Sequence, residues 1–311
     1  MKVTVLSGGV GGARFLDGVA RALPAGALTA VVNTGDDLVH LGLHVSPDLD
    51  SVLYALAGLA DEERGWGRAN ETWRALETVA TLGGEAWFQL GDLDLGLHLV
   101  RTQALASGLP LSAVTARLAE ALGVETALLP ATDDRLRTWL DTPAGSFSLQ
   151  EWFVARGHRD EVDAVRFEGA ETARPAPGVL EALASADLIL VAPSNPHVSI
   201  GPILAVDEVR RAVETRSVPA VGISPLIGGR SVKGPADRML LRLAGGTTPA
   251  HVASCYPGLL DALVIDEADA AGADELADLG VRPIVTRTLM SDAAARARLV
   301  EAALGAAGAL L

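Results

Sequence analysis

The fold is decided by residues 3–14, which read VTVLSGGVGGAR. The first four are apolar or β-branched, and residues 8–12 then contain four glycines. A short buried strand that runs into a glycine-rich turn and a helix is the opening unit of an α/β fold. We therefore predict a strand over residues 3–6 and a helix over residues 12–23.

Outward from this stretch, apolar runs alternate with helix-like segments. Strands are predicted over residues 28–33, 126–129, 188–192, 220–224, 263–266 and 283–286. Helices are predicted over residues 48–59, 71–82, 94–107 and 111–122, and a closing helix has Ser291 as its N-cap. Continuous apolar strands separated by helices indicate a mostly parallel sheet covered on both faces. The fold class is therefore α/β, with a Rossmann-like three-layer domain.

Residues 135–169 follow a different pattern, with short alternating strands around a small helix at residues 150–155. Alternation is typical of strands that have one exposed face. We expect a smaller antiparallel α+β insertion, or lid, over residues 135–169. The main α/β domain would then comprise residues 1–134 and 170–311.

The overall composition excludes several classes of protein. The formal net charge of −14 argues against nonspecific nucleic-acid binding, which needs clustered positive charge. The most apolar stretch, residues 188–206, is broken by three prolines, so no membrane helix is expected there. Cys255 is the only cysteine, which excludes an intrachain disulfide. The short apolar start of the chain predicts a cytoplasmic protein.

The glycine-rich turn is a candidate phosphate site. Gly8, Gly9, Gly11 and Gly12 would let backbone N–H groups approach a phosphate at a helix N-terminus, and Arg14 would add a full positive charge. The turn is not a Walker A loop, and Arg14 stands where the dinucleotide fingerprint needs its third glycine. The alternative is a tight strand–helix turn without a ligand.

Acidic residues follow the second predicted strand. Asn33, Asp36 and Asp37 lie there, and adjacent carboxylates beside a phosphate loop suit Mg²⁺. The alternative is an Asx-turn with solvated acids.

The next predicted helix also begins with acidic residues. Ser46 is a suitable N-cap, and Asp48 in the first turn could be structural. Asp50 lies two residues further on, roughly 200° around the helix, so the two acids are not expected to face one ligand. We expect Asp50 to be functional.

One face of the helix over residues 94–107 is polar. Asp94, His98 and Arg101 recur at helical spacing, with Leu95 and Leu99 on the opposite face. We interpret His98 and Arg101 as binding residues. The alternative is an ordinary solvated stripe.

Later loops follow the strands at residues 188–192 and 220–224. Ser194, Asn195 and Ser224 offer donors and acceptors, and Lys233 with Gly234 offers a cation on a glycine loop. We expect these residues to bind a second phosphate or a purine carbonyl. A surface charge on a glycine loop is the alternative for Lys233.

Taken in order, these loops resemble the 2-phospho-L-lactate transferase family. The matching stretches are SGGVGGARFL at residues 7–16, VNTGDD at 32–37, SPDLD at 46–50, APSNP at 192–196, SIGPI at 199–203 and SPLI at 224–227. The glycine loop ending in Ala13 and Arg14 is similar to that of the actinobacterial-type members, the phosphoenolpyruvate transferases of deazaflavin coenzyme F-420 biosynthesis. Leu93 stands where many members carry an arginine, for which Arg101 is a possible substitute.

The resemblance implies a reaction. A phosphoenolpyruvyl or 2-phospho-L-lactyl group would pass from a guanylylated three-carbon acid to the ribityl hydroxyl of the deazaflavin Fo, releasing GMP in the presence of Mg²⁺. It implies a homodimer, catalytic roles for Asp36, Asp37 and Asp50, and metal binding by Asp36 and Asp50. By the same resemblance, Asp50 and the Arg101 region would line the Fo pocket, and the 194–195 and 233–234 loops the guanylate pocket.

Two other classes use the same loops. One is a nucleotidyltransferase or other nucleotide-dependent transferase, and the other is a non-catalytic guanine-nucleotide-binding regulator of the same fold.

Overall fold

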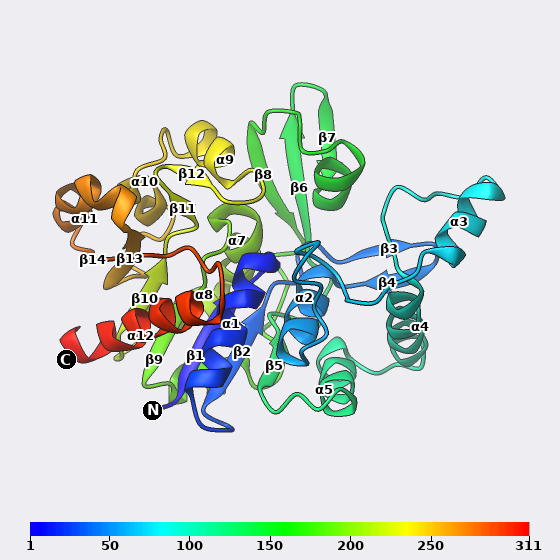
Figure 1. The fold of residues 1–311 in the computed structure, drawn as a ribbon, viewed down its shortest axis with the longest axis horizontal. Helices are drawn as coiled ribbons and strands as arrows, with labels where there is room; N and C mark the ends of the chain where they lie inside the picture. Colours follow the sequence, from blue (N-terminus) through cyan, green and yellow to red (C-terminus); the bar gives the residue numbers. More distant parts are fainter. Residues whose placement is uncertain (311) are drawn as a thin grey trace.

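The centre of the molecule is a seven-stranded parallel sheet in the order β14-β13-β10-β9-β1-β2-β5 (Figure 1). The computed structural model describes residues 1–310. The strands are β1 (Val3–Ser7), β2 (Leu28–Val32), β5 (Ala127–Pro130), β9 (Leu188–Val191), β10 (Ala220–Ile223), β13 (Ala262–Asp266) and β14 (Arg282–Thr286). All seven were predicted from the apolar runs, with bounds that agree to within one residue.

Helices cover both faces of this sheet, which confirms the three-layer α/β fold. One face packs against α1 (Gly9–Ala22), α2 (Pro47–Leu56), α5 (Leu111–Ala121) and α12 (Ala293–Leu310). The other packs against α6 (Val179–Ser185), α7 (Gly201–Ala205), α8 (Asp207–Glu214), α9 (Ala236–Leu243), α10 (Pro249–Ser254) and α11 (Ala273–Asp278). Within β9, Leu188 and Leu190 enter the first core, and Ile189 and Val191 enter the second. Alternate side chains of a strand point to opposite faces, so a strand apolar throughout serves two cores.

Two smaller units project from the layers (Figure 1). The first, which we call the arm, consists of the hairpin β3 (Leu38–His40) and β4 (Leu43–Val45) with α3 (Arg74–Thr81) and α4 (Asp92–Ala106). The hairpin was not predicted. The second unit lies within residues 135–169, where an insertion was predicted. It is an antiparallel sheet of β6 (Arg137–Thr142), β7 (Gly145–Ser148) and β8 (Ala164–Glu168), with the π-helix η1 (Glu151–Ala155). Its action as a lid stays a prediction.

The strand order reverses between β1 and β9. The chain runs from β1 to β2 and β5 on one side of the sheet, and then returns to place β9 on the other side of β1. Such a switch point opens a crevice outside the carboxyl ends of the strands, where ligands bind in this architecture. The Ser194 hydroxyl, just after β9, donates to the Gly8 carbonyl oxygen at 2.7 Å and so ties the two strand tips together.

The glycine-rich stretch is packed against its own chain. Helix α1 begins at Gly9 and not at Gly12, so most of the glycines lie in its first turn. A Cβ on Gly12 would lie 2.4 Å from Ser7 Oγ and 2.7 Å from Ser194 Oγ, and one on Gly11 would lie 2.9 Å from the Pro193 carbonyl oxygen. At these two positions glycine is required for close packing of the switch point.

The start of α12 differs from the prediction. Asp292 Oδ1 accepts from the Ala295 N–H at 2.8 Å, so Asp292 caps α12 and the expectation for Ser291 is wrong. Ser291 Oγ instead donates to Asp292.

Within residues 1–310, no helix is both long enough and apolar enough to span a bilayer.

Substitution of Gly12 by alanine tests the packing of the switch point. We expect Gly12→Ala to lower the free energy of unfolding by about 1–3 kcal/mol, because the added methyl group overpacks a closed site. Gly305→Ala is the matched control, since Gly305 lies in α12 with nothing within 4 Å of its added Cβ. It should raise stability by about 0.5–1 kcal/mol. Equal urea-unfolding midpoints for the two variants would contradict this account.

Candidate active site

A cavity of about 570 Å³ begins at the switch point and extends between the insertion and the arm. Gly9 of α1 and Ser199, which follows β9, line it at the switch point. Its polar wall consists of Asp36, Asp48, Asp50, Asp94, His98 and Gln150. Its apolar wall includes Tyr54, Trp66, Trp87, Phe88, Leu90 and Phe153. The volume suits a small organic ligand, and convergent polar groups on an apolar wall are typical of ligand sites.

Asp36 and Asp48 share one amide at the switch-point end. Asn33 Nδ2 donates to Asp48 Oδ2 at 2.9 Å and to Asp36 Oδ1 at 3.4 Å, and Gln150 Nε2 donates to Asp36 Oδ2 at 3.0 Å. Burial, followed by repulsion from Asp48, raises the pKa of Asp36 well above its ordinary value. Burial also raises the pKa of Asp48 to about 6, against the hydrogen bonds from Asn33 and the Gly9 amide.

Asp37 lies behind this wall. Its Oδ2 accepts from Ser46 Oγ at 2.8 Å and lies 3.0 Å from His44 Nε2, and the residue is buried outside the cavity lining. Ser46 is the N-cap residue of α2, as predicted, but its hydroxyl donates to the buried Asp37 carboxylate and makes no capping hydrogen bond. Asp37 stays a predicted catalytic residue, but its contacts favour a role in holding β4 and α2 together.

Asp50 forms a buried ion pair with Arg101. Arg101 Nη1 donates to Asp50 Oδ2 at 3.0 Å, and Nη2 donates to Oδ1. Arg101 is 1% exposed, and its Nη1 also lies 3.2 Å from His98 Nδ1. Burial lowers the pKa of His98, so its ring is neutral at pH 7. The polar face of α4 is thus directed inward, as the binding interpretation predicted, and Leu99 and Val100 are exposed instead.

Asp48 and Asp50 line the same cavity, contrary to the expectation from their helical angle. Both belong to the first turn of α2. Pro47, Ser51 and Tyr54 also line the cavity, which therefore covers the first turn of α2 and continues along one side of the helix. Both acids of the first turn reach it. The positive end of the helix dipole also favours their negative charge.

The arm end of the cavity carries a second acidic contact and most of the aromatic rings. The Tyr54 hydroxyl donates to Asp94 Oδ1 at 2.5 Å. Trp87 packs edge-on against His40 with ring centroids 5.1 Å apart, and Phe88 lies 5.8 Å from the same ring. Sequence reasoning missed these aromatic side chains, because residues 85–90 show no periodic pattern that would place them at a site.

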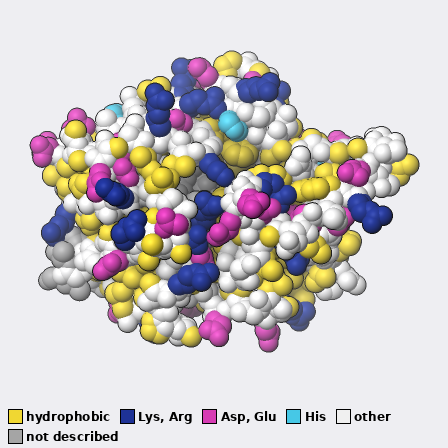
Figure 2. Space-filling model, in the orientation of Figure 1, with side chains coloured by type: hydrophobic (Ala, Val, Ile, Leu, Met, Phe, Trp, Pro, Cys, Tyr) yellow, Lys and Arg dark blue, Asp and Glu magenta, His cyan; other side chains and the backbone are white. Residues whose placement is uncertain are grey.

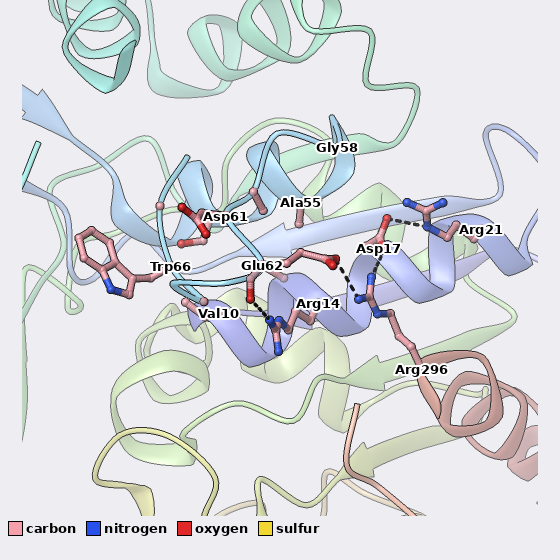
Figure 3. A pocket seen from close by; sticks show the side chains of 15 residues that line it. Val10, Arg14, Asp17, Arg21, Ala55, Gly58, Asp61, Glu62, Trp66 and Arg296 are labelled. Carbon is pink, nitrogen blue, oxygen red and sulfur yellow. Dashed lines mark hydrogen bonds and ion pairs between the residues drawn. The ribbon is translucent and has the colours of Figure 1, made fainter. Parts of the chain in front are cut away.

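Arg14 lies outside this cavity (Figure 3). It lines a neighbouring cavity of about 230 Å³, where its Nη2 donates to the Glu62 carbonyl oxygen at 3.4 Å. Asp17 in the same cavity pairs with Arg21 and Arg296. Because α1 begins at Gly9, Arg14 lies more than one turn along the helix. In Figure 2, Lys and Arg side chains gather down the middle of this face of a chain whose net charge is −14.

The later loop residues make mostly internal contacts. Asn195 Oδ1 caps the π-helix η2 (Pro196–Ile200) by accepting from the His197 N–H at 2.9 Å. The Ser224 hydroxyl accepts from the Leu226 N–H at 3.2 Å. Lys233 is exposed, with Nζ against Gly65, and Gly234 lies near the Phe153 ring. Ser194, Asn195, Ser224, Lys233 and Gly234 do not line the main cavity, so their binding roles stay predictions.

Arg101 does not replace the arginine that many family members carry at the position of Leu93. Leu93 is 41% exposed at the start of α4, whereas Arg101 is buried and both its terminal nitrogens bond Asp50. Arg101 therefore cannot supply the charge of an exposed arginine at position 93.

A divalent cation fits one part of this wall. Within residues 1–310, no group of three or more His, Cys, Asp or Glu residues forms a complete metal site. Mg²⁺ needs only one or two carboxylates when substrate phosphates and water complete its coordination. The Asn33 side-chain amide donates to both Asp36 and Asp48, and the pKa values of both carboxyl groups are raised. A cation bound between them would relieve their repulsion. Asp50 stays a predicted ligand, but its Arg101 pairing favours Asp48 in that place.

An acid-lined cavity at the switch point of a doubly wound parallel sheet defines the class: an α/β protein with a candidate ligand site where this architecture binds ligands. The sequence model of the 2-phospho-L-lactate transferase CofD family matches residues 3–286. The chain belongs to this family and is a transferase, as the motifs predicted.

Curated relatives match over the full length. A phosphoenolpyruvate transferase of Streptomyces griseus is 45% identical over 310 residues, which cover 98% of each chain. A phosphoenolpyruvate transferase of Mycolicibacterium smegmatis is 42% identical over 99% of each chain. A solved structure of a UPF0052-family protein from Bacillus halodurans superposes with a TM-score of 0.64 at 20% identity, covering 97% of this chain and 98% of its own. That similarity confirms the fold.

The buried pair gives a stability prediction. We expect Arg101→Leu to lower the free energy of unfolding by about 3–5 kcal/mol, because Asp50 would remain as a buried charge without a partner. The control is the double variant Asp50→Asn/Arg101→Leu, which removes both charges and should recover part of the loss. Urea unfolding at pH 7 measures both. A single variant as stable as the parent protein would contradict the pairing.

The pKa of Asp48 gives a pH prediction. Its folded-state pKa of about 6 exceeds the ordinary value of 3.8, so the folded protein holds this proton more tightly than the unfolded chain. The contribution of Asp48 to stability is therefore fully present below pH 3.8 and is lost as the pH rises through 6. With chelator present, the parent protein should lose stability relative to Asp48→Asn between these pH values. Parallel curves of unfolding free energy against pH would rule this out.

Proposed function

We propose that this transferase moves a phosphoenolpyruvyl or 2-phospho-L-lactyl group from its GMP diphosphate donor to the terminal ribityl hydroxyl of the deazaflavin Fo, releasing GMP in coenzyme F-420 biosynthesis. The name of the curated relatives supports enolpyruvate as the three-carbon acid. A cytoplasmic location and a homodimer belong to this proposal.

The observation that carries the proposal is that one cavity joins two chemically different ends. The switch-point end holds Asp36 and Asp48 beside the N-terminus of α1 and suits a metal-bound diphosphate. Aromatic side chains gather at the arm end, where Trp87 and Phe88 offer surfaces for a flat tricyclic ring. A transferase that brings a diphosphate donor to a deazaflavin acceptor needs both ends within one enclosure.

Phosphoryl chemistry depends on positioning and on neutralisation of charge. The acceptor hydroxyl oxygen attacks the phosphorus that bears the three-carbon acid, and the bond from that phosphorus to the GMP oxygen breaks. Asp36 and Asp48 would hold Mg²⁺, which supplies positive charge to the diphosphate when bound. The helix dipole of α1 favours the negative charge of the phosphates.

The guanylate end of the donor is assigned by the resemblance of the later loops. Ser194, Asn195 and Ser224 are held rigidly by their internal hydrogen bonds, which presents fixed backbone groups to a base. Lys233 lies against the loop that carries Trp66 and Gly67, at the rim shared by both cavities. We infer that Lys233 and Arg14 approach the departing GMP.

The direct test is incubation with Fo, Mg²⁺ and one guanylylated acid at a time, carrying lactate, enolpyruvate or glycerate. Mass analysis should show Fo enlarged by one phosphodiester-linked acid, with the enolpyruvyl donor used best. Product from a different nucleotide donor but none from the guanylylated acids would favour another nucleotide-dependent transferase.

Substitution of the proposed metal ligands gives a further prediction. Asp36→Asn should lower kcat by about 100-fold or more, because a transition-state charge loses its counter-ion. Asp207→Asn is the control, since Asp207 is exposed on α8 away from the cavity. Turnover of Asp36→Asn equal to that of the control would remove Asp36 from the site.

A further inference from the structure

The carboxylates of the cavity differ in how many of their oxygens are already bonded. Both oxygens of Asp36 accept hydrogen bonds, one from Asn33 and one from Gln150. Both oxygens of Asp50 accept from the Arg101 guanidinium. Each oxygen of these two carboxylates thus already accepts a hydrogen bond from the protein, which makes it a weaker base than an oxygen without such a donor.

Asp48 and Asp37 are also committed. Asp48 accepts from Asn33 and from the Gly9 amide, and it is the favoured partner of Asp36 for a cation. Asp37 is buried behind the lining, with its Oδ1 out of contact with solvent. The acid that receives the proton of the acceptor hydroxyl must therefore be sought elsewhere on the wall.

Asp94 has the required free oxygen. Its Oδ1 accepts from the Tyr54 hydroxyl at 2.5 Å, whereas Oδ2 accepts no hydrogen bond from residues 1–310, and the residue lines the cavity. Its backbone is fixed as well, because the Glu71 carboxylate accepts from the N–H groups of Leu93 and Asp94 at 2.8 Å each. The Tyr54 hydrogen bond holds the carboxylate and the Glu71 hydrogen bonds hold the backbone, so the position of Asp94 Oδ2 is fixed.

His98 lies one helical turn further along the same face and supplies a donor. Arg101 Nη1 can only donate, so the neutral His98 ring accepts at Nδ1 and carries its hydrogen on Nε2. No hydrogen bond within residues 1–310 engages Nε2, and His98 lines the cavity. An open acceptor and an open donor on adjacent turns match the two hydrogen-bonding functions of a hydroxyl group.

We propose that Asp94 is the proton acceptor for the attacking hydroxyl, and that His98 positions this hydroxyl through Nε2–H. The inference rests on the proposed function. The O–H bond of the acceptor breaks as its oxygen bonds to phosphorus. The proton passes to Asp94 Oδ2, and the electron pair of the broken P–O bond leaves with GMP. Asp94 then returns its proton to solvent.

The surroundings of Asp94 suit this role. Burial raises the pKa of Asp94, and the hydrogen bond from the Tyr54 hydroxyl lowers it. Repulsion from Asp50 and Glu71 raises it further. Arg101 is the remaining charged group on this face of α4, and it is paired with Asp50. A raised pKa makes the ionised carboxylate a stronger base toward the hydroxyl proton.

The test compares Asp94→Asn with Asp92→Asn, a matched control two residues away that lies outside the cavity lining. At pH 7, we expect Asp94→Asn to lose about 100-fold or more in kcat, in the range of general-base catalysis. Fo affinity, followed by quenching of tryptophan fluorescence, should change by less than about threefold. The acid limb of the pH–kcat profile should disappear in Asp94→Asn and persist in Asp92→Asn. Unchanged kcat, or an unchanged acid limb, would overturn the assignment.

Two further variants separate positioning from catalysis. His98→Gln keeps an N–H donor and should retain kcat within about tenfold, whereas His98→Leu should lose more kcat than it gains in KM. Equal kcat for the two would remove the positioning role. If the parent protein forms no Fo product with any guanylylated acid, the proposed function fails. If the parent is active and Asp94→Asn is equally active, only this inference fails.

Discussion

Carboxylates that converge on one buried cavity repel one another, and the rest of the site is arranged around that repulsion. Asp36 and Asp48 lie on a single amide of Asn33, which cannot neutralise two negative charges. Burial removes the water that would otherwise screen them, so their pKa values rise. Such a wall is poised to bind a cation, and a protein with two carboxylates in this position gains stability when the cation arrives.

At the arm end of the cavity, side chains of the protein itself are the partners of the carboxylates. Asp50 is matched inside the protein by Arg101, and Asp94 by the Tyr54 hydroxyl. These contacts are made by one face of α4, which explains why this helix buries its polar side and exposes Leu99 and Val100. The two ends of the cavity therefore differ in what they still lack: positive charge at the switch point, and a partner for a hydroxyl group at the arm.

Much of the fold followed from the sequence because apolar strands and glycine turns are local signals. All seven strands of the sheet were placed by their apolar runs, and the tips of β1 and β9 meet as a parallel sheet requires. The site was predicted less completely. The helical angle separated Asp48 from Asp50, but both line a cavity that covers the first turn of α2 and continues along the helix as far as Tyr54.

Other features of the site depend on contacts that are distant in sequence. Arg14 was expected at the phosphates, but the true start of α1 at Gly9 carries it along the helix to a second cavity. Nothing local indicates that Trp87 and Tyr54 line one cavity, or that one oxygen of Asp94 has no protein donor while both oxygens of Asp50 have one. The identity of a side chain is a local property, but its remaining hydrogen-bonding capacity is set by the whole fold.

The Glu71 carboxylate at the start of α4 has a consequence for how ligands enter. A helix N-terminus would ordinarily attract phosphate, but here a side chain of the protein already occupies the two leading N–H groups. The arm end of the cavity therefore does not favour a polyanion, and the two ends of the cavity differ in this respect. In the proposed reaction the phosphates of the donor would therefore lie at the switch-point end and the acceptor at the arm end. The difference between the two ends would then orient both substrates.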